Sequence, residues 1–466
     1  MVFSSSVFLI FFLPIVVIGY YLPFIGSRKY KNVFLLAASL GFYAYGEPVY
    51  VCILLFSIVY NWFMGRMIGR REKNDGKRKT LLFWGVFVNL LFLFCFKYLN
   101  FTIWNLNYIF GVGIPETGIL LPIGISFYTF QAISYLADIY TGKAEAQKSV
   151  LDVGVYIALF PQLVAGPIVR YDTIAKEIHE RKESYRDAYE GIHRFIIGIG
   201  KKILLADRLA VLADRAFSLP ASELSAAMAW LGAGAYTMQV FFDFSAYSDM
   251  AIGLGKIFGF HFMENFDYPY VSKTITEFWR RWHISLGSWF RDYVYIPLGG
   301  NRRGRWIQVR NLLIVWGLTG LWHGANWTFL LWGLLQFLVL FVEKATGYAR
   351  RANGLGRLYV IPVFLIGWSL FRAETVSGAL SYLAAMFGGS GIFVDKMAAV
   401  YCMNFLIWLI LGLWFCIPHQ KLHEMTGRLP DRIRMPAAEF VYAAVFLVSF
   451  AYIIRASYSP FIYFNF

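Results

Sequence analysis

The chain has 466 residues, of which 58% are hydrophobic, 19% are aromatic and only 15% are charged. A soluble domain of this length would carry about 25% charged residues. The composition therefore excludes an ordinary soluble enzyme and indicates a membrane protein. The formal net charge of +15 is concentrated in the connections between long apolar runs.

The clearest apolar runs cover residues 2–21, 33–65, 312–342 and 440–454. A hydrocarbon core about 30 Å thick needs roughly 20 apolar residues in a helix. Without water to bind the backbone, only helices or a closed barrel can span it. Because these runs are continuous and do not alternate, we predict an all-α polytopic protein with roughly nine to twelve transmembrane helices.

Two basic clusters, at 66–79 and 302–310, indicate the topology. Such clusters can bind nucleic acid, but cytoplasmic loops also retain Lys and Arg. We favour topology as the cause and expect no nucleic-acid partner. With 66–79 in the cytoplasm, the turn at 46–48 lies outside, and so does the N-terminus. The first run lacks a basic start and a cleavage site, so we interpret it as a retained span.

The C-terminal end of the chain fits the same orientation. A last span leads into the aromatic tail 458–466, which we also expect outside. We therefore predict one integral-membrane domain over 1–466, with N-terminal spans in 1–110 and C-terminal spans in 358–457.

Two stretches are too polar for spans. Residues 170–208 mix charges with moderate apolarity, which favours an amphipathic cytoplasmic segment. Residues 277–310 interleave tryptophans with arginines, which favours the headgroup level of the bilayer.

The run at 311–342 is too long for a single span. As one helix it would reach roughly 48 Å. Both of its flanks are basic, so both ends should be cytoplasmic, and the segment 317–327 contains three glycines. We predict a broken helical hairpin with His323 near its turn, at membrane depth, where only protein or a water-filled cavity can surround irregular backbone.

His323 is an ionisable residue inside an uncharged run, and such residues are functional candidates. The alternative is a structural imidazole bonded to a neighbouring carbonyl. Desolvation should keep the ring neutral, and a neutral imidazole can take a proton from a hydroxyl. We therefore predict His323 as a general base. Asn326, one helical turn on if the helix continues, would orient the ring or substrate, and Trp322 and Trp327 would exclude water.

His283 is the second candidate. Its neighbours Arg280 and Arg281 are cationic, so its ring should also resist protonation. An interfacial structural histidine is an equally good interpretation. The arginines could bind a phosphate-bearing donor, because guanidinium matches phosphate bidentately, or they could anchor the chain at the membrane surface. The other five histidines are expected to be solvated, interfacial or capping: His179, His193, His261, His419 and His423.

A metal site is weakly indicated. Asp243 and Asp249 flank a short polar stretch and could form a metal pair, but no histidine accompanies them. The four cysteines have no metal-type spacing and are expected to be buried thiols: Cys52, Cys95, Cys402 and Cys416. No P-loop and no Gly-x-Ser-x-Gly motif is present. We expect chemistry without a metal or an internal serine nucleophile.

Seven segments together resemble the membrane-bound O-acyltransferase (MBOAT) family, in the branch that acetylates alginate and cell-wall polysaccharides. They follow one another in register along residues 1 to 345, and those most typical of the family lie in 121–345. The matching segments are 1–9, 121–128, 165–167, 243–251, 276–283, 291–302 and 321–327.

The resemblance implies a bowl-like helical fold with a central tunnel and cytoplasmic amphipathic or re-entrant helices, in a bacterial cytoplasmic membrane. The catalytic histidine of the family maps to His323, and a second family histidine maps to His283. The implied donor is a cytoplasmic acyl thioester, acetyl-CoA, with no permanently bound cofactor. Its phosphates would lie near Arg280, Arg281 and Arg291.

The implied partners are an extracytoplasmic serine hydrolase-like acetyltransferase or a small membrane protein, and a polysaccharide acceptor. Three alternatives stay open. The same fold could transfer D-alanine to teichoic acid. A channel or lipid flippase could use the cavity without catalysis. A scaffold of a secretion complex would leave His323 without a function.

Overall fold

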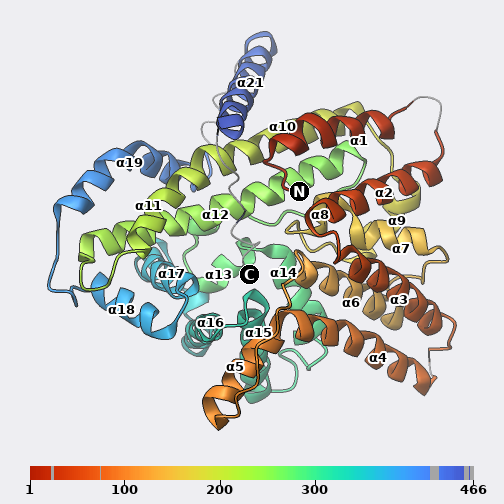
Figure 1. The fold of residues 1–466 in the computed structure, drawn as a ribbon, viewed down its shortest axis with the longest axis horizontal. Helices are drawn as coiled ribbons and strands as arrows, with labels where there is room; N and C mark the ends of the chain where they lie inside the picture. The colour runs from red at the N-terminus through yellow and green to blue at the C-terminus, as the bar shows by residue number, and fades with distance from the viewer. Residues whose placement is uncertain (23–25, 74, 420–423, 425–429, 456–460, 462–466) are drawn as a thin grey trace. The chain divides into compact units, whose positions relative to one another are not determined.

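The computed structural model describes the chain except for residues 23–25, 74, 420–423, 425–429, 456–460 and 462–466. Within the described residues every regular element is a helix and no strand is present (Figure 1). This confirms the all-α prediction, which depended on continuous apolar runs.

The chain is a multi-pass membrane protein. Six helical segments of the described residues are long and apolar enough to cross a membrane: Val51–Gly69, Gly76–Phe110, Trp327–Thr346, Gly354–Arg372, Lys396–Phe415 and Asp431–Arg455. Two apolar helices are shorter, Phe8–Tyr20 and Val376–Met386. The larger count of nine to twelve spans stays a prediction, as do the central tunnel and the orientation. The aromatic tail expected outside lies, except for Phe461, beyond the described residues.

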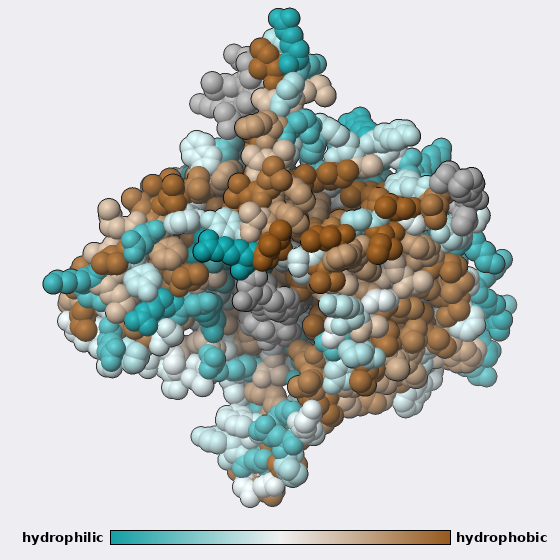
Figure 2. Space-filling model, turned by 45° about the horizontal axis from the view of Figure 1, so that its top comes forward, coloured by the Kyte–Doolittle hydropathy of each residue, from teal (hydrophilic) through white to brown (hydrophobic). Residues whose placement is uncertain are grey.

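The surface has the apolar character that a bilayer requires. Large apolar side chains are exposed along α19 (Lys396–Phe415), including Ile407, Ile410 and Leu413. Apolar residues, in brown, also cover much of the face seen in Figure 2. Exposed apolar area of this extent is unusual in soluble monomers and fits contact with lipid.

The described residues form two compact units, while the prediction of one functional domain stays untested. Unit 1 comprises Met1–Phe195 and Ser248–Met263. Its elements are η1 (Phe8–Phe12), α1 (Leu13–Tyr20), α2 (Arg28–Gly46), α3 (Val51–Gly69), α4 (Gly76–Leu93), η2 (Phe94–Tyr98), α5 (Leu99–Phe110), α6 (Ile125–Thr141), α7 (Val150–Ala158), α8 (Phe160–Leu163), α9 (Tyr171–Glu180) and most of α10 (Tyr185–Gly200).

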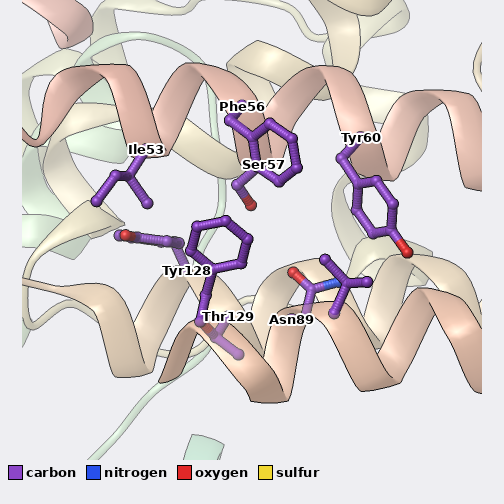
Figure 3. A pocket seen from close by; sticks show the side chains of 9 residues that line it. Ile53, Phe56, Ser57, Tyr60, Asn89, Tyr128 and Thr129 are labelled. Atoms are coloured by element: carbon purple, nitrogen blue, oxygen red, sulfur yellow. The ribbon is translucent and has the colours of Figure 1, made fainter. Parts of the chain in front are cut away.

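Polar side chains join the candidate spans of unit 1. Asn61 on α3 and Asn89 on α4 exchange amide hydrogen bonds of 3.1 and 2.8 Å. Such bonds between membrane helices contribute about 1 kcal/mol each. Beside them lies a small pocket between α3, α4 and α6, lined by Ser57, Tyr128 and Thr129 among others (Figure 3). It contains no histidine, so we assign it to helix packing.

Unit 2 comprises Ile196–Tyr247 and Glu264–Phe466. It contains both candidate histidines. Its elements are η3 (Lys201–Ala206), α11 (Asp207–Phe217), most of α12 (Ala226–Ile257), η4 (Pro269–Val271), α13 (Ile275–Arg281), α14 (Ile284–Phe290), η5 (Arg291–Tyr295), α15 (Arg305–His323), α16 (Trp327–Thr346), η6 (Tyr348–Arg350), η7 (Gly354–Gly356), α17 (Arg357–Arg372), α18 (Val376–Met386), α19 and α21 (Asp431–Arg455).

The two polar stretches form short helices. In α9 the buried residues Tyr171, Ile174 and Ile178 recur every three or four positions, which confirms an amphipathic helix. In the second stretch the expected headgroup level stays a prediction, but two tryptophans face other protein side chains. Trp282 and Trp289 are buried in unit 2, because Trp282 packs on Trp368 with ring centroids 4.9 Å apart and Trp289 packs on its neighbour Phe290.

The predicted broken hairpin is present. Helix α15 ends at His323 and α16 begins at Trp327, and the two lie side by side (Figure 1). Their close approach depends on two glycines. A Cβ atom on Gly320 would lie 2.5 Å from the Phe329 carbonyl oxygen, and one on Gly333 would lie 2.4 Å from that of Trp316. The helices therefore pack backbone to backbone, as small residues permit in membranes.

We predict that Gly320→Ala or Gly333→Ala destabilises the protein. The added methyl group must force the helices apart, at a cost of about 1–3 kcal/mol. Gly317→Ala, on the same helix, is the matched control because its Cβ would meet nothing within 4 Å. It should be neutral or stabilising, since alanine favours helix. Thermal unfolding in detergent measures the difference, and equal effects at positions 317 and 320 would contradict the backbone contact.

Candidate active site

His323 lies at the break of the hairpin, enclosed by aromatic rings. Its side chain is buried, with 4% of its residue area exposed. The centroids of Trp322, Trp332 and Phe371 lie 5.0, 5.2 and 5.1 Å from that of its imidazole, each at a steep interplanar angle. Edge-to-face contacts of this kind contribute about 0.5–1.5 kcal/mol each. They fix the plane of the imidazole and exclude water from it.

His283 lies between α13 and α14 in an unusual backbone conformation. Its φ is +44°, and it is one of only two non-glycine residues with positive φ among the described residues. Such a conformation costs about 1–3 kcal/mol and is frequent at functional sites. The residue is only 2% exposed. Its ring packs edge-on against Phe244 with the centroids 4.6 Å apart.

Trp322 connects the two histidines. Its ring centroid lies 5.8 Å from that of His283 and 5.0 Å from that of His323. Trp322 is itself buried. The structure therefore brings together three of the predicted site residues, although they come from segments 40 positions apart in the chain.

His283 is neutral, as predicted, but for a different reason. Burial lowers the pKa of its imidazole to about 3, and no nearby cation contributes. Arg281, two positions before it in the sequence, is paired with carboxylates: it donates to Asp267 at 2.8 Å and to Glu277 at 3.1 Å. The cause is therefore desolvation, not the repulsion that the sequence suggested.

The three arginines predicted to bind donor phosphates have different surroundings. Arg281 is occupied by two carboxylates, and Arg291 pairs with Asp292 at 2.7 Å. Arg280 is exposed, forms no ion pair with a described residue, and lies near enough to Lys344 for their charges to interact. Only Arg280 keeps the features expected of a phosphate ligand.

Two predictions around the hairpin turn are wrong. Asn326 does not follow His323 by one helical turn, because α15 ends at His323. Its side chain instead caps α16, accepting from the Thr328 amide at 3.1 Å and donating to the Glu374 carbonyl at 2.7 Å. Trp327 is 42% exposed, so it does not shield the site from water as Trp322 does.

The two aspartates considered as a metal pair each form an ion pair with a basic side chain. Asp243 accepts from Lys202 at 2.6 Å, and Asp207 also pairs with Lys202, at 2.9 Å. Asp249 accepts from Arg194 at 2.8 Å. Among the described residues no group of three candidate metal ligands is found. The ion pairs explain these buried carboxylates without a metal.

The remaining candidates show mixed outcomes. Of the four cysteines expected to be buried, Cys416 is buried and Cys52 is exposed. His179 and His261 are about half exposed and lie beside carboxylates of unit 1, while His423 lies outside the described residues.

Glu343 is a buried residue of this region that the sequence interpretation missed. Its carboxylate, on α16, accepts from the backbone amides of Ile275 at 2.6 Å and Thr276 at 2.9 Å. The hydroxyl groups of Thr276 and Tyr359 also donate to it. Glu343 therefore caps α13, the helix that leads to His283, and ties it to the hairpin of His323. A lone carboxylate at the end of an apolar run was the available signal.

We predict that Glu343→Ala strongly destabilises unit 2. It removes the acceptor of two hydroxyl groups and of the Thr276 amide, and leaves the Ile275 amide only the Tyr359 oxygen at 3.3 Å. Each buried donor left without an acceptor costs about 1–3 kcal/mol. Tyr359→Phe, which removes one of the four donors, is the control and should cost about 1 kcal/mol. Thermal unfolding in detergent distinguishes them. Equal melting temperatures for Glu343→Ala and the unmodified protein would show that the carboxylate does not hold α13.

The sequence matches a known protein family and several known proteins. Residues 144–382 match the model of MBOAT, the membrane-bound O-acyltransferase family. The chain is 44% identical to a Pseudomonas putida protein named "Probable alginate O-acetylase AlgI" over 83% of this chain and 80% of that one. It is 32% identical to the peptidoglycan O-acetyltransferase of Helicobacter pylori over 100% of this chain and 98% of the relative.

A more distant relative is the teichoic acid D-alanyltransferase of Bacillus subtilis. It is 31% identical over 49% of this chain and 62% of its own length. The family match covers α13 to α16 and therefore both buried histidines. The all-helical membrane fold, the family match and the extent of these likenesses lead to one conclusion: the chain belongs to the membrane-bound O-acyltransferase family and is an acyltransferase.

Proposed function

We propose that the protein transfers an acetyl group from a thioester to a hydroxyl group, for O-acetylation of a polysaccharide of the bacterial cell envelope. The names of its relatives support the acyl group and the class of acceptor, alginate for one and peptidoglycan for another. The observation that carries the proposal is the pair of buried imidazoles, His283 and His323, that pack on the same tryptophan.

His323 is the general base of the proposed reaction. The acceptor oxygen attacks the thioester carbonyl carbon while its proton passes to the neutral imidazole. The tetrahedral intermediate then collapses, the carbon–sulfur bond breaks, and the imidazolium returns the proton to the leaving thiolate. The aromatic enclosure of His323 supports this function, because a dry, rigid site holds both reactants in position.

We propose acetyl-CoA as the donor, entering from the cytoplasm. Its phosphates would bind near Arg280, which is exposed and lies near enough to the second cation Lys344 for their charges to interact. Arg281 and Arg291 become weaker candidates because carboxylates already occupy them. The donor supplies the acetyl group and leaves as the free thiol.

The acetyl group would be received on the outer side of the cytoplasmic membrane. We propose that both chain termini lie on the outer side of this membrane and that the basic connections lie on the cytoplasmic side. The partner in this proposal is an extracytoplasmic serine hydrolase-like acetyltransferase or a small membrane protein, whose hydroxyl passes the group to the polysaccharide.

D-Alanine transfer is the nearest alternative in the same family. Its relatives match only about half of this chain, whereas the acetyltransferases match 83% or more. Lipid transport without catalysis is the alternative of another class. Thioester turnover distinguishes an acyltransferase from a transporter, since a transporter would release no thiol.

We predict that His323→Ala lowers acetyl transfer by at least about 100-fold, the contribution of a general base. The assay uses the full chain in lipid nanodiscs with acetyl-CoA and follows thiol release and acetylation of an added hydroxyl acceptor. His179→Ala, a half-exposed histidine of unit 1, is the matched control and should retain activity.

Three outcomes would contradict parts of this proposal. Unchanged transfer by the His323→Ala variant, at equal protein level, would remove His323 as the base. Thiol release from a D-alanyl thioester but not from acetyl-CoA would favour the teichoic acid reaction. No thiol release from either donor by the unmodified protein would favour transport.

A further inference from the structure

Asn265 binds the histidine segment with both its main chain and its side chain. The residue is fully buried and lies between α12 and α13. Its carbonyl oxygen accepts from the Ile284 amide at 3.0 Å. Its Oδ1 accepts from the Ser285 amide at 3.1 Å and from the Ser285 hydroxyl at 2.9 Å. These bonds hold the left-handed backbone of His283 between Trp282 and Ile284.

The same Oδ1 atom lies 3.1 Å from His283 Nδ1. The amide orientation of Asn265 is fixed by the Ser285 backbone, because an N–H group can only donate and so must face the oxygen. Nδ1 of His283 therefore faces an acceptor. In a neutral imidazole one nitrogen carries the proton and the other carries the lone pair. The proton must then be on Nδ1 and the lone pair on Nε2.

We propose that Asn265 is a positioning residue that fixes His283 in the Nδ1–H tautomer, so that Nε2 can only accept a hydrogen bond from a substrate bound at the site of acyl transfer. The proposal rests on the proposed function and deepens it. The same tautomer excludes another possible function of His283, which is to donate a hydrogen bond to the oxyanion of the tetrahedral intermediate. Nε2 carries a lone pair in this tautomer and has no proton to donate.

The surroundings of His283 keep this arrangement in place. Phe244 packs at 88° to the imidazole and Trp322 at 61°, so the ring is held on two sides. Because burial lowers its pKa to about 3, the ring is neutral throughout the physiological range, and the choice of tautomer decides what it can do.

The first test reads the tautomer directly. The full chain, labelled with ¹⁵N-histidine in lipid nanodiscs, is studied by NMR, with the His283 signal assigned by its loss in His283→Gln. We expect a protonated Nδ1 and an unprotonated Nε2 in the unmodified protein, and loss of this preference in Asn265→Ala. A protonated Nε2 in the unmodified protein would overturn the proposal. This readout needs no turnover, so it stays valid even if acetyl transfer fails.

The second test measures transfer kinetics. Asn265→Ala should lower kcat by at least about 10-fold with little change in KM, as for other histidines that lose a tautomer-fixing partner. Asn265→Asp keeps an acceptor in place and should restore most of kcat.

Ser369→Ala is the matched control for the kinetics. It removes a part-buried hydrogen bond of unit 2, from the Ser369 hydroxyl to the Leu365 carbonyl, that involves neither histidine. Its kcat should match that of the unmodified protein. An Asn265→Ala variant that keeps its kcat, or an Asn265→Asp variant that regains none of the lost kcat, would overturn the proposal.

Discussion

The close backbone packing of α15 against α16 is the constraint on which the candidate site depends. Gly320 and Gly333 let the two helices approach so closely that a Cβ atom at either position would clash with a carbonyl oxygen of the facing helix. Helix α15 stops at His323, and Asn326 starts α16 by capping its first turn. The histidine therefore lies at the end of a rigid helix and not in a loose loop. The imidazole can then be enclosed by aromatic rings without room to turn.

Buried hydrogen bonds bring the segment that carries His283 close to His323. Glu343 ties the start of α13 to the hairpin, and Asn265 holds the backbone on which His283 lies. Each bond satisfies polar groups that would be costly if left unpaired in an apolar core. The same bonds that stabilise unit 2 thus also set the positions of both imidazoles around Trp322. Stability and proposed chemistry share these contacts, so variants must be compared by more than loss of activity.

Sequence patterns predicted the local features of this site. The length of the run and its glycines predicted a broken hairpin, and an ionisable residue in an uncharged run predicted His323. The hydrogen-bond partners far away in the sequence could not be predicted, because Asn265 is 18 positions from His283 and Glu343 is 67 positions from Thr276. Local context also misled. Arg281 seemed available for a phosphate, but it pairs with Glu277 on the same helix and with Asp267. Asn326 seemed to follow His323 on a helix that in fact ends there.

The central claim is that acyl transfer takes place at His323, close to His283 and Trp322. Electron cryomicroscopy of the full chain in nanodiscs, with a ketone analogue of acetyl-CoA whose sulfur is replaced by CH2, tests it most directly. We expect density for the ketone carbonyl beside His323, in contact with Trp322 and on the side facing His283. Density for the acyl end elsewhere, such as the pocket between α3, α4 and α6, would contradict it.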